Sequence, residues 1–247
     1  MDLPKNDEKQ ESAVKPGSSR PLLLGHRGAR PLPRIGASSE DLPAENTLAA
    51  FDYALANACD GFEFDVRFTR DRRAVLCHDP QLDGKEISAT DYSDLLRGRN
   101  ELACLKDVFT RFGDTAYLDI ELKVGGHEAQ VVGALRAKPP SHGHVVSSFF
   151  PEVLVRISQL DAALPLGYIC DRPECVKIWT ELPISVFIPQ HKLVSPEMID
   201  AVHRRGLKLF VWTVNQRRDL LRLADGGVDG LISDDPALLS CTFPSVA

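Results

Sequence analysis

The sequence predicts an α/β fold, a (β/α)8 barrel with an extra antiparallel hairpin strand and a small insertion after it. Short apolar runs rich in β-branched residues recur along the chain, and helical stretches lie between most of them. Nearly continuous apolar strands that alternate with helices are typical of a parallel sheet covered by helices. The length of 247 residues is that of one such barrel. A doubly wound open sheet is the alternative, because these patterns alone do not prove closure.

Nine runs have the pattern of strands, one more than the barrel needs. The expected strands are Leu22–His26, Phe62–Phe68, Ala74–His78, Ala116–Leu122, His144–Ser148, Leu164–Ile169, Ser185–Gln190, Leu207–Val214 and Val228–Ser233. The expected helices are Asn46–Ala58, Leu102–Phe112, His127–Lys138, Pro151–Leu160, Pro173–Thr180, Pro196–Arg205, Arg217–Ala224 and Pro236–Leu239. Only residues 69–73 separate the second strand from the third, whereas a parallel crossover needs a dozen or more residues. We therefore expect these two strands to pair as an antiparallel hairpin, so that the other eight close the barrel.

The composition along the chain indicates its domain organisation. Residues 1–20 are rich in Lys, Glu, Ser and Pro and are expected to be a disordered tail. A single catalytic barrel domain is expected over residues 21–247. Residues 79–101 are polar and lack clear periodicity, which favours a small insertion or cap on that barrel. A second irregular stretch, 29–44, has the length of a lid or a binding loop.

Charge and composition argue against several classes of protein. The net charge of −6, from 29 basic and 35 acidic residues, argues against nucleic-acid binding, which needs a basic stripe. The N-terminal stretch lacks the apolar segment of a secretory signal, and no run of 18 apolar residues predicts a transmembrane helix. The six cysteines form no CxxC pair and no zinc-ligand spacing. We expect a protein of a reducing, cytoplasmic compartment, and a homo-oligomer is compatible with the sequence.

Acidic residues interrupt two of the predicted strands. Glu63 and Asp65 are spaced i, i+2 and share one face of a strand, and Asp119, Glu121 and Lys123 share one face of another. Adjacent buried carboxylates repel each other, and a divalent cation relieves that cost. Hard oxygen ligands favour Mg²⁺ or Ca²⁺ over zinc. The alternative is a set of ion pairs with nearby cations. Both strands end at the barrel mouth where active sites of this fold gather, which favours a metal site of Glu63, Asp65 and Glu121.

Two histidines end predicted strands near these carboxylates. His26 ends the first strand, and His78 ends the hairpin strand. Cleavage of a phosphodiester requires activation of a nucleophile and protonation of the departing alkoxide, and a histidine pair performs both near neutral pH. Arg27 is suited to neutralising phosphate oxygens. Asp79 either orients His78 or begins the following turn.

The order of these residues along the chain is itself informative. The motifs in sequence are His26-Arg27-Gly28, Glu45-Asn46-Thr47-Leu48, Glu63-Phe64-Asp65-Val66, His78-Asp79, Glu121-Leu122-Lys123, Trp212-Thr213-Val214-Asn215 and Gly227-Val228-Asp229-Gly230-Leu231-Ile232-Ser233-Asp234. Together they resemble the glycerophosphodiester phosphodiesterase family over residues 21–239. The resemblance implies a barrel related to phosphatidylinositol phospholipases C, and hydrolysis of a glycerophosphodiester to sn-glycerol 3-phosphate and an alcohol.

The resemblance also implies a role for each motif residue. The implied roles are the acid–base pair for His26 and His78, metal ligands for Glu63, Asp65 and Glu121, with one Mg²⁺ or Ca²⁺, and phosphate contacts for Arg27 and Lys123. Attack by the glycerol hydroxyl, through a cyclic phosphate, and direct attack by water both remain open. The departures from the family pattern are a long 28–45 segment, a hairpin turn without glycine and a changed stretch at 81–85. All three lie in loops, so they affect the choice of substrate more than the chemistry.

Several residues have two interpretations. Glu45-Asn46-Thr47 either caps a helix or joins the site, and Trp212 is either a wall of the glycerol pocket or a core aromatic. Phe149 and Phe150 either pack or face a substrate tail. The rival activities on the same barrel are those of a lysophospholipase D and a phospholipase C. Two further alternatives are a catalytically inactive barrel that serves as a binding module and a glycosidase that uses Glu63 and Glu121 as its carboxylate pair. The sequence leaves the alcohol group open.

Overall fold

The structure is a computed structural model, and it describes residues 20–30, 43–97, 99 and 101–244. All but Arg20 of the expected tail lies outside these residues. Most of the expected 29–44 loop lies outside them too. Within the described ranges, no helix is long and apolar enough to cross a membrane.

Eight parallel strands close into a barrel. They are β1 (Leu22–Gly25), β2 (Gly61–Phe68), β6 (Tyr117–Leu122), β7 (His144–Ser148), β8 (Leu166–Cys170), β9 (Val186–Pro189), β10 (Lys208–Val211) and β11 (Gly230–Ser233). Their spatial order is β1-β11-β10-β9-β8-β7-β6-β2, and pairing of β2 with β1 completes the ring. The barrel predicted from the sequence is therefore confirmed, and the open sheet is excluded.

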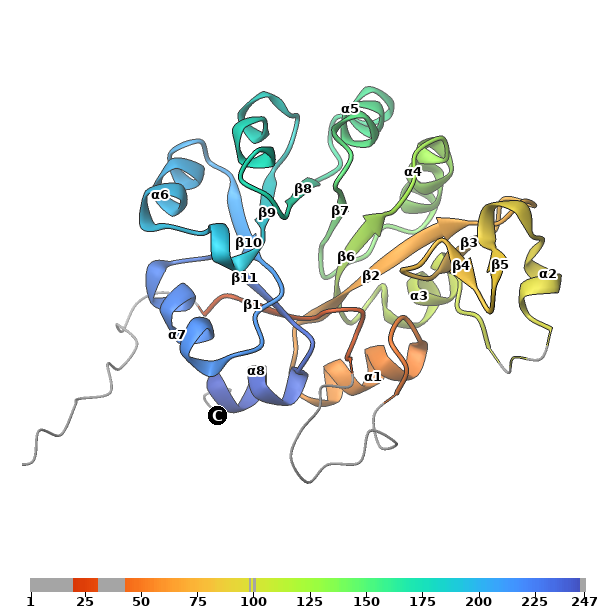
Figure 1. Cartoon of the computed structure of the whole chain (residues 1–247), viewed down its shortest axis with the longest axis horizontal. Coiled ribbons are helices and arrows are strands. Elements are labelled where there is room, and N and C mark those ends of the chain that lie inside the picture. Colours follow the sequence, from red (N-terminus) through yellow and green to blue (C-terminus); the bar gives the residue numbers. More distant parts are fainter. Residues whose placement is uncertain (1–19, 31–42, 98, 100, 245–247) are drawn as a thin grey trace, which may run out of the picture.

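Helices surround the strands as an outer ring (Figure 1). They are α1 (Leu48–Ala56), α3 (Leu105–Phe112), α4 (Glu128–Ala137), α5 (Pro151–Leu160), α6 (Pro196–Arg204), α7 (Arg217–Gly226) and α8 (Pro236–Thr242). Ser195 and Asp235 cap α6 and α8, and each is followed by a proline at the first helical position, where no N–H is needed. The helix predicted over Pro173–Thr180 is wrong. Two 3₁₀ turns replace it, η3 (Cys175–Lys177) and η4 (Trp179–Glu181), because so short a stretch with β-branched residues nucleates a helix poorly.

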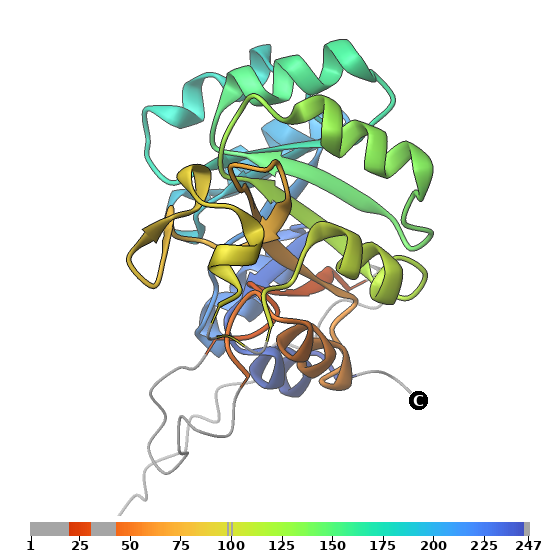
Figure 2. The same cartoon turned by 90° about the vertical axis from the view of Figure 1, so that its right-hand side faces the viewer.

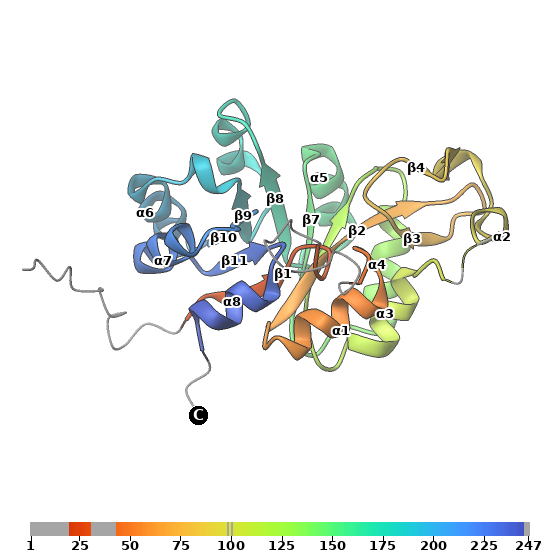
Figure 3. The same ribbon diagram turned by 60° about the horizontal axis from the view of Figure 1, so that its bottom comes forward.

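The predicted hairpin is confirmed. β2 pairs antiparallel with β3 (Ala74–Leu76), with Val66 opposite Leu76. The insertion that follows contains a two-stranded sheet of β4 (Gln81–Leu82) and β5 (Lys85–Glu86), the 3₁₀ turn η2 (Ile87–Ala89) and the short helix α2 (Tyr92–Leu95). It lies beside the barrel, next to the hairpin (Figures 1, 2 and 3). Five buried residues hold it there, namely Val75, Ile87, Leu95, Leu102 and Cys104. This polar stretch thus has a small apolar core of its own.

The interior of the barrel is divided into a polar and an apolar side. Side chains that face the axis alternate along each strand with those that pack under the helices. On β8, β9, β10 and β11 the axis-facing positions are apolar, as at Ile169, Ile188 and Ile232. On β2 and β6 the corresponding positions carry carboxylates, among them Glu63 and Glu121. The fold therefore concentrates charged side chains on one wall of the barrel mouth, and the opposite wall is apolar.

Candidate active site and cation-binding centre

The parallel pairing of β2 with β6 brings the acidic residues together. In this register Asp65 lies beside Glu121, and Glu63 lies beside Asp119. One carboxylate oxygen from each of Glu63, Asp65 and Glu121 lies within 4.8 Å of the other two. The three residues that the i, i+2 spacing selected are thus one cluster. Asp65 and Glu121 lie in the carboxyl halves of β2 and β6, toward the end of the barrel where this fold places its active sites.

The cluster is buried and electrostatically costly. Glu63, Asp65 and Glu121 are 3%, 1% and 6% exposed. Burial, together with the charges of Asp65 and Glu121, raises the pKa of Glu63 well above its ordinary value. Burial and the charge of Asp65 likewise raise the pKa of Glu121 to about 7, although Lys123 opposes the rise. Charged forms are disfavoured here unless a cation accompanies them.

A divalent cation fits this donor set. Glu63 Oε1 is buried and has no hydrogen-bond partner in the described part of the chain. A buried oxygen of this kind is expensive unless something binds it. Three carboxylates converging on one point supply the hard ligands that Mg²⁺ and Ca²⁺ prefer. The residues can therefore hold a divalent cation.

Two basic side chains form ion pairs with the cluster. Lys123 Nζ lies 2.6 Å from Glu121 Oε1 and 3.3 Å from Asp65 Oδ1. Arg27 Nε lies 3.1 Å from Asp65 Oδ2. Burial raises the cost of the charge on Asp65, but Lys123 and Arg27 outweigh it and hold the pKa of that carboxyl below its ordinary value. Glu121 and Asp65 in turn outweigh burial at Lys123 and raise its pKa. Both basic residues thus lie against the carboxylate cluster, and their contact with phosphate stays a prediction.

The turn after β1 fixes the positions of both the backbone amide and the side chain of Arg27. Arg27 has a φ of 52°, and Gly28 after it has a φ of 80°. A Cβ at Gly28 would lie 2.7 Å from the backbone of Ala50, so only glycine fits this turn. The turn aims the Arg27 amide at Glu63 Oε2, to which it donates a hydrogen bond of 2.9 Å. The guanidinium reaches Glu45 Oε1 at 2.8 Å.

His26 is held by residues from the other end of the chain. Its Nδ1 lies 2.6 Å from Asp234 Oδ1, at the end of β11. Asn215 donates from Nδ2 to Asp234 Oδ2 at 2.6 Å, and its own Oδ1 accepts from Ser233 Oγ. Burial favours neutral Asp234, but the hydrogen bonds from His26 and Asn215 hold its pKa below the ordinary value. The Nε2 atom of His26 is left facing the acidic cluster, 3.8 Å from Glu63 Oε2.

His78 is held more loosely, at the rim of the barrel. Its Nδ1 lies 2.8 Å from Asp79 Oδ1, so the first interpretation of Asp79, as the partner of His78, matches the geometry. Arg67 fixes the backbone by donating from Nε and Nη2 to the His78 carbonyl at 2.9 and 2.7 Å. Partial burial lowers the pKa of His78, although Asp79 opposes the change. The lowered pKa favours the neutral form of His78, which is the form that can accept a proton.

The Glu45-Asn46-Thr47 stretch serves both of its predicted purposes. Thr47 caps α1 by accepting a hydrogen bond from the Ala50 amide. Asn46 is buried and pairs reciprocally with Asp65, donating to Oδ2 at 2.8 Å and accepting from the Asp65 amide at 3.1 Å. Asn46 has a φ of 58°, a conformation that asparagine tolerates better than most residues. Asn46 and Glu45 therefore orient Asp65 and Arg27.

The apolar side of the mouth faces these polar groups across a small cavity. Trp212 lines the cavity, and its ring centre lies 6.4 Å from that of His26. The cavity has a volume of about 20 Å³, enough for one water molecule or a small ion. Phe149 packs edge-on against Trp212, and Lys123 Nζ lies 5.5 Å over the Phe149 ring. Phe150 is 43% exposed. Trp212 is thus a wall of the site.

Sequence reasoning placed Asp119 on the acidic face but gave it no role. It lies one layer deeper than Glu121 and lines the same cavity. Ser147 donates to Asp119 Oδ1 at 2.6 Å, whereas Oδ2 has no hydrogen-bond partner among the described residues. Burial raises the pKa of Asp119 to about 7. The alternation Asp119, Glu121, Lys123 was the signal available for this fourth carboxyl.

Asp234 and Asn215 were also missed as site residues. Both occur in motifs that carried the family resemblance, but nothing local in the sequence pairs Asp234 with a histidine 208 residues earlier. The pairing depends on β1 and β11 being neighbours, which only barrel closure brings about.

A closed parallel barrel with a buried carboxylate cluster, ion-paired basic residues and oriented histidines at its mouth contains the groups that metal-assisted hydrolysis requires. Residues 26–238 match the model of the glycerophosphoryl diester phosphodiesterase family. The chain therefore belongs to this family, a class of phosphoric diester hydrolases.

Individual relatives agree with this assignment. The chain is 29% identical over 243 residues to a glycerophosphodiester phosphodiesterase of Caldanaerobacter subterraneus subsp. tengcongensis, covering 88% of this chain and 96% of that one. It is 27% identical over 259 residues to a glycerophosphodiester phosphodiesterase of Bacillus subtilis, covering 89% and 85%. Its fold resembles that of an Oleispira antarctica phosphodiesterase solved with the product sn-glycerol-3-phosphate. The TM-score is 0.75 at 23% identity, and the match covers 92% of this chain and 98% of that one.

Proposed function

We propose that this enzyme hydrolyses glycerophosphodiesters to sn-glycerol 3-phosphate and an alcohol, with one bound Mg²⁺ or Ca²⁺. The observation that carries the proposal is the convergence of Glu63, Asp65 and Glu121 in a buried cluster with an unpartnered oxygen. The three carboxylates would hold the cation. When bound, the cation supplies Lewis-acid stabilisation of charge on the phosphate.

We assign acid–base catalysis to His26 and His78. The bond to Asp234 keeps a proton on Nδ1 of His26, so Nε2 is free to accept or return a proton within the site. The corresponding bond to Asp79 leaves Nε2 of His78 free at the rim. One histidine would take the proton of the attacking hydroxyl, and the other would protonate the leaving alkoxide. The two positions are consistent with this division, because one is buried and the other faces solvent.

Arg27 and Lys123 are assigned to the phosphate. Both are charged, and both already lie against carboxylates of the cluster. An incoming phosphodiester would exchange these ion pairs for contacts with its non-bridging oxygens. Trp212 would pack against the carbon skeleton of the glycerol, since its ring forms one wall of the cavity. The polar and apolar walls together suit a small polyol joined to a phosphate.

The experiment is an assay of glycerophosphocholine and glycerophosphoethanolamine with Mg²⁺, with Ca²⁺ and with chelator. We expect activity only with metal, and loss of at least about a hundredfold in kcat for His26→Ala. Calorimetry with each cation gives an independent readout, in which Glu121→Gln should abolish binding whether or not a substrate has been found. Full activity in chelator, or His26→Ala at the wild-type rate, would overturn the proposal.

Product analysis decides between the proposed reaction and its rivals. Release of sn-glycerol 3-phosphate supports the proposal. In parallel assays with acylated substrates, release of diacylglycerol from a phospholipid would indicate a phospholipase C, and release of a lysophosphatidate, open or cyclic, from a lysophospholipid would indicate a lysophospholipase D. Phosphorus NMR during the reaction also distinguishes a cyclic phosphate intermediate from direct attack by water. The cytoplasmic location stays a prediction that rests on the cysteine pattern.

A further inference from the structure

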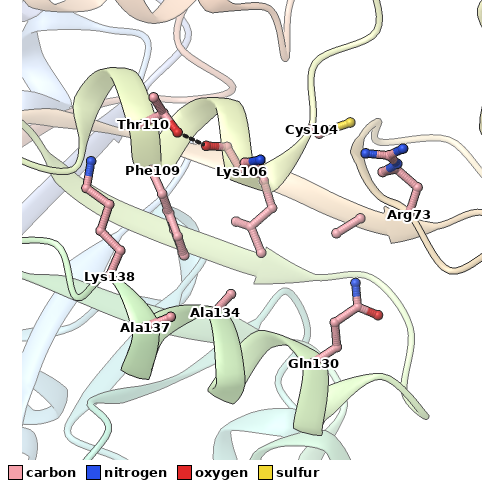
Figure 4. A pocket seen from close by; sticks show the side chains of 11 residues that line it. Arg73, Cys104, Lys106, Phe109, Thr110, Gln130, Ala134, Ala137 and Lys138 are labelled. Carbon is pink, nitrogen blue, oxygen red and sulfur yellow. Dashed lines mark hydrogen bonds between the residues drawn. The ribbon is translucent and has the colours of Figure 1, made fainter.

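We propose that a groove on the outside of the barrel, between α3 and α4, is a binding site for a single-chain anionic amphiphile, that is, an alkyl chain with a carboxylate or phosphate head. The groove lies away from the catalytic mouth. Its 11 lining residues come from both helices, from the hairpin and from Cys104, which directly precedes α3 (Figure 4). Its volume is about 330 Å³, within the range of small-molecule sites.

The floor of the groove is apolar. Ala74, Leu105 and Phe109 are at most 7% exposed and form its base, and Ala134 and Ala137 of α4 form the opposite side. The small alanine side chains keep α4 from filling the space between the helices, as Figure 4 shows. The groove is therefore suited to an alkyl chain, which gains by leaving water.

The rim of the groove is cationic. Lys138 lies at one end and Arg73 at the other, with Lys106 between them (Figure 4). No aspartate or glutamate lines the groove, although the chain as a whole has a net charge of −6. Lys106 and Arg73 lie within ion-pairing distance of no acid in the described ranges, and Lys138 reaches the exposed Asp114 only at 3.9 Å. The Arg73 guanidinium also lies 5.0 Å over the Tyr92 ring, a contact that does not neutralise its charge. Two basic residues without an ion pair among the described residues, and a third with a long one, select an anionic head group.

The size of the groove favours a small molecule over a protein. A stable protein–protein interface uses about 20–30 residues on each side, well above the 11 that line this groove. A neutral alkyl ligand would cover the apolar floor, but it would not pair with the three basic side chains at the rim. The occupant that uses both features is an amphiphile with one chain and one anionic head.

The test is calorimetry on the full chain with metal and saturating sn-glycerol 3-phosphate, so that the catalytic mouth is occupied. The probes are decanoate, decyl phosphate, decyl glucoside and decyltrimethylammonium, each below its micelle concentration. We expect one saturable site for an anionic probe, with at least tenfold weaker binding of the neutral and cationic probes. If only one of the two anions binds, the proposal holds and the head group is identified.

Variants locate the site. The double variant Lys106→Glu/Lys138→Glu should weaken binding of the anion at least tenfold, and Ala134→Phe should block the groove. Lys208→Glu, at an exposed position at the start of β10, is the matched control and should bind normally. Phosphodiesterase activity should be unchanged in all of them, because none touches the catalytic mouth. No saturable binding of either anion, equal affinity for the neutral probe, or insensitivity to both groove variants would overturn the proposal.

Discussion

Asp234→Asn tests whether the buried contact with His26 matters for catalysis. The carboxylate accepts from His26 Nδ1 through one oxygen and from Asn215 Nδ2 through the other, both at 2.6 Å. An amide has only one acceptor oxygen. Asn215 cannot turn to compensate, because its own oxygen already accepts from Ser233 and from the Asp234 amide. The introduced NH₂ group therefore meets either the Asn215 donor or the His26 ring.

The size of the expected effect follows from the bond that is lost. A hydrogen bond to a charged group contributes about 1.5–3 kcal/mol. At about 1.4 kcal/mol for each factor of ten, the loss corresponds to a decrease in kcat of roughly 10- to 150-fold. An NH₂ group facing Nδ1 also favours the tautomer with its proton on Nε2, which cannot act as a base. KM and cation affinity should change less than about twofold, since Asp234 is not among the clustered ligands.

The assay is steady-state kinetics with glycerophosphocholine, accompanied by calorimetric titration of the cation. Asp229→Asn is the matched control, because Asp229 precedes β11 as Asp234 follows it and also pairs with a histidine, His203 Nε2, at 2.9 Å. The control should keep the wild-type kcat. If folded Asp234→Asn retains the rate of the control, the orientation of His26 by Asp234 is not part of catalysis.

Three further outcomes are expected. In chelator, the free energy of unfolding should fall as the pH rises from about 4.5 to about 7, because the raised pKa of Glu121 makes the folded state bind more protons than the unfolded state. The contribution of Glu121 to this fall is at most about 3.4 kcal/mol. A flat profile in urea titrations would contradict this prediction. Asp119→Asn removes a carboxyl whose pKa is raised to about 7, so the free energy of unfolding should fall less steeply with pH. The same variant should lower cation affinity about tenfold in calorimetry. Unchanged affinity would show that Asp119 does not influence the cation. Asn46→Ala should destabilise the protein by about 2–3 kcal/mol, because it leaves the buried Asp65 amide unpaired, whereas Asn57→Ala, at the end of α1, should cost less than about 1 kcal/mol.

Local pattern predicted most of the fold and the acidic part of the site. The face of the strand on which Glu63, Asp65 and Glu121 lie follows from the alternation of side chains along each strand alone. The parallel register of β2 and β6 then brings the three residues together. The hairpin followed from a connection too short to cross over. What could not be predicted depends on contacts between distant strands. The pairing of His26 with Asp234 exists only because β1 and β11 are adjacent in the closed ring.

The internal structure of the predicted insertion and the α3–α4 groove escaped prediction for another reason. The apolar residues of the insertion, such as Ile87 and Leu95, follow neither the helical nor the strand period, because two-residue strands and single turns bury them one at a time. The groove is absent from any local pattern, since it depends on which side chains fail to fill the space between two helices. Periodicity therefore finds regular elements and misses small cores and gaps.

The division of the barrel interior links catalysis to stability. Four buried carboxyl groups, Glu63, Asp65, Asp119 and Glu121, gather on the β2–β6 side, and the two basic residues that pair with them leave Glu63 Oε1 and Asp119 Oδ2 without partners among the described residues. Such a cluster destabilises the metal-free fold. A cation that binds only the folded state offsets this cost by RT ln(1 + [M]/Kd). The same carboxylates that are proposed to bring a Lewis acid to the phosphate thus make the stability of the barrel depend on its metal. An apolar replacement for Glu63, whose pKa burial and its neighbours raise and whose Oε1 has no partner among the described residues, should stabilise the metal-free protein and weaken cation binding together, as one physical change.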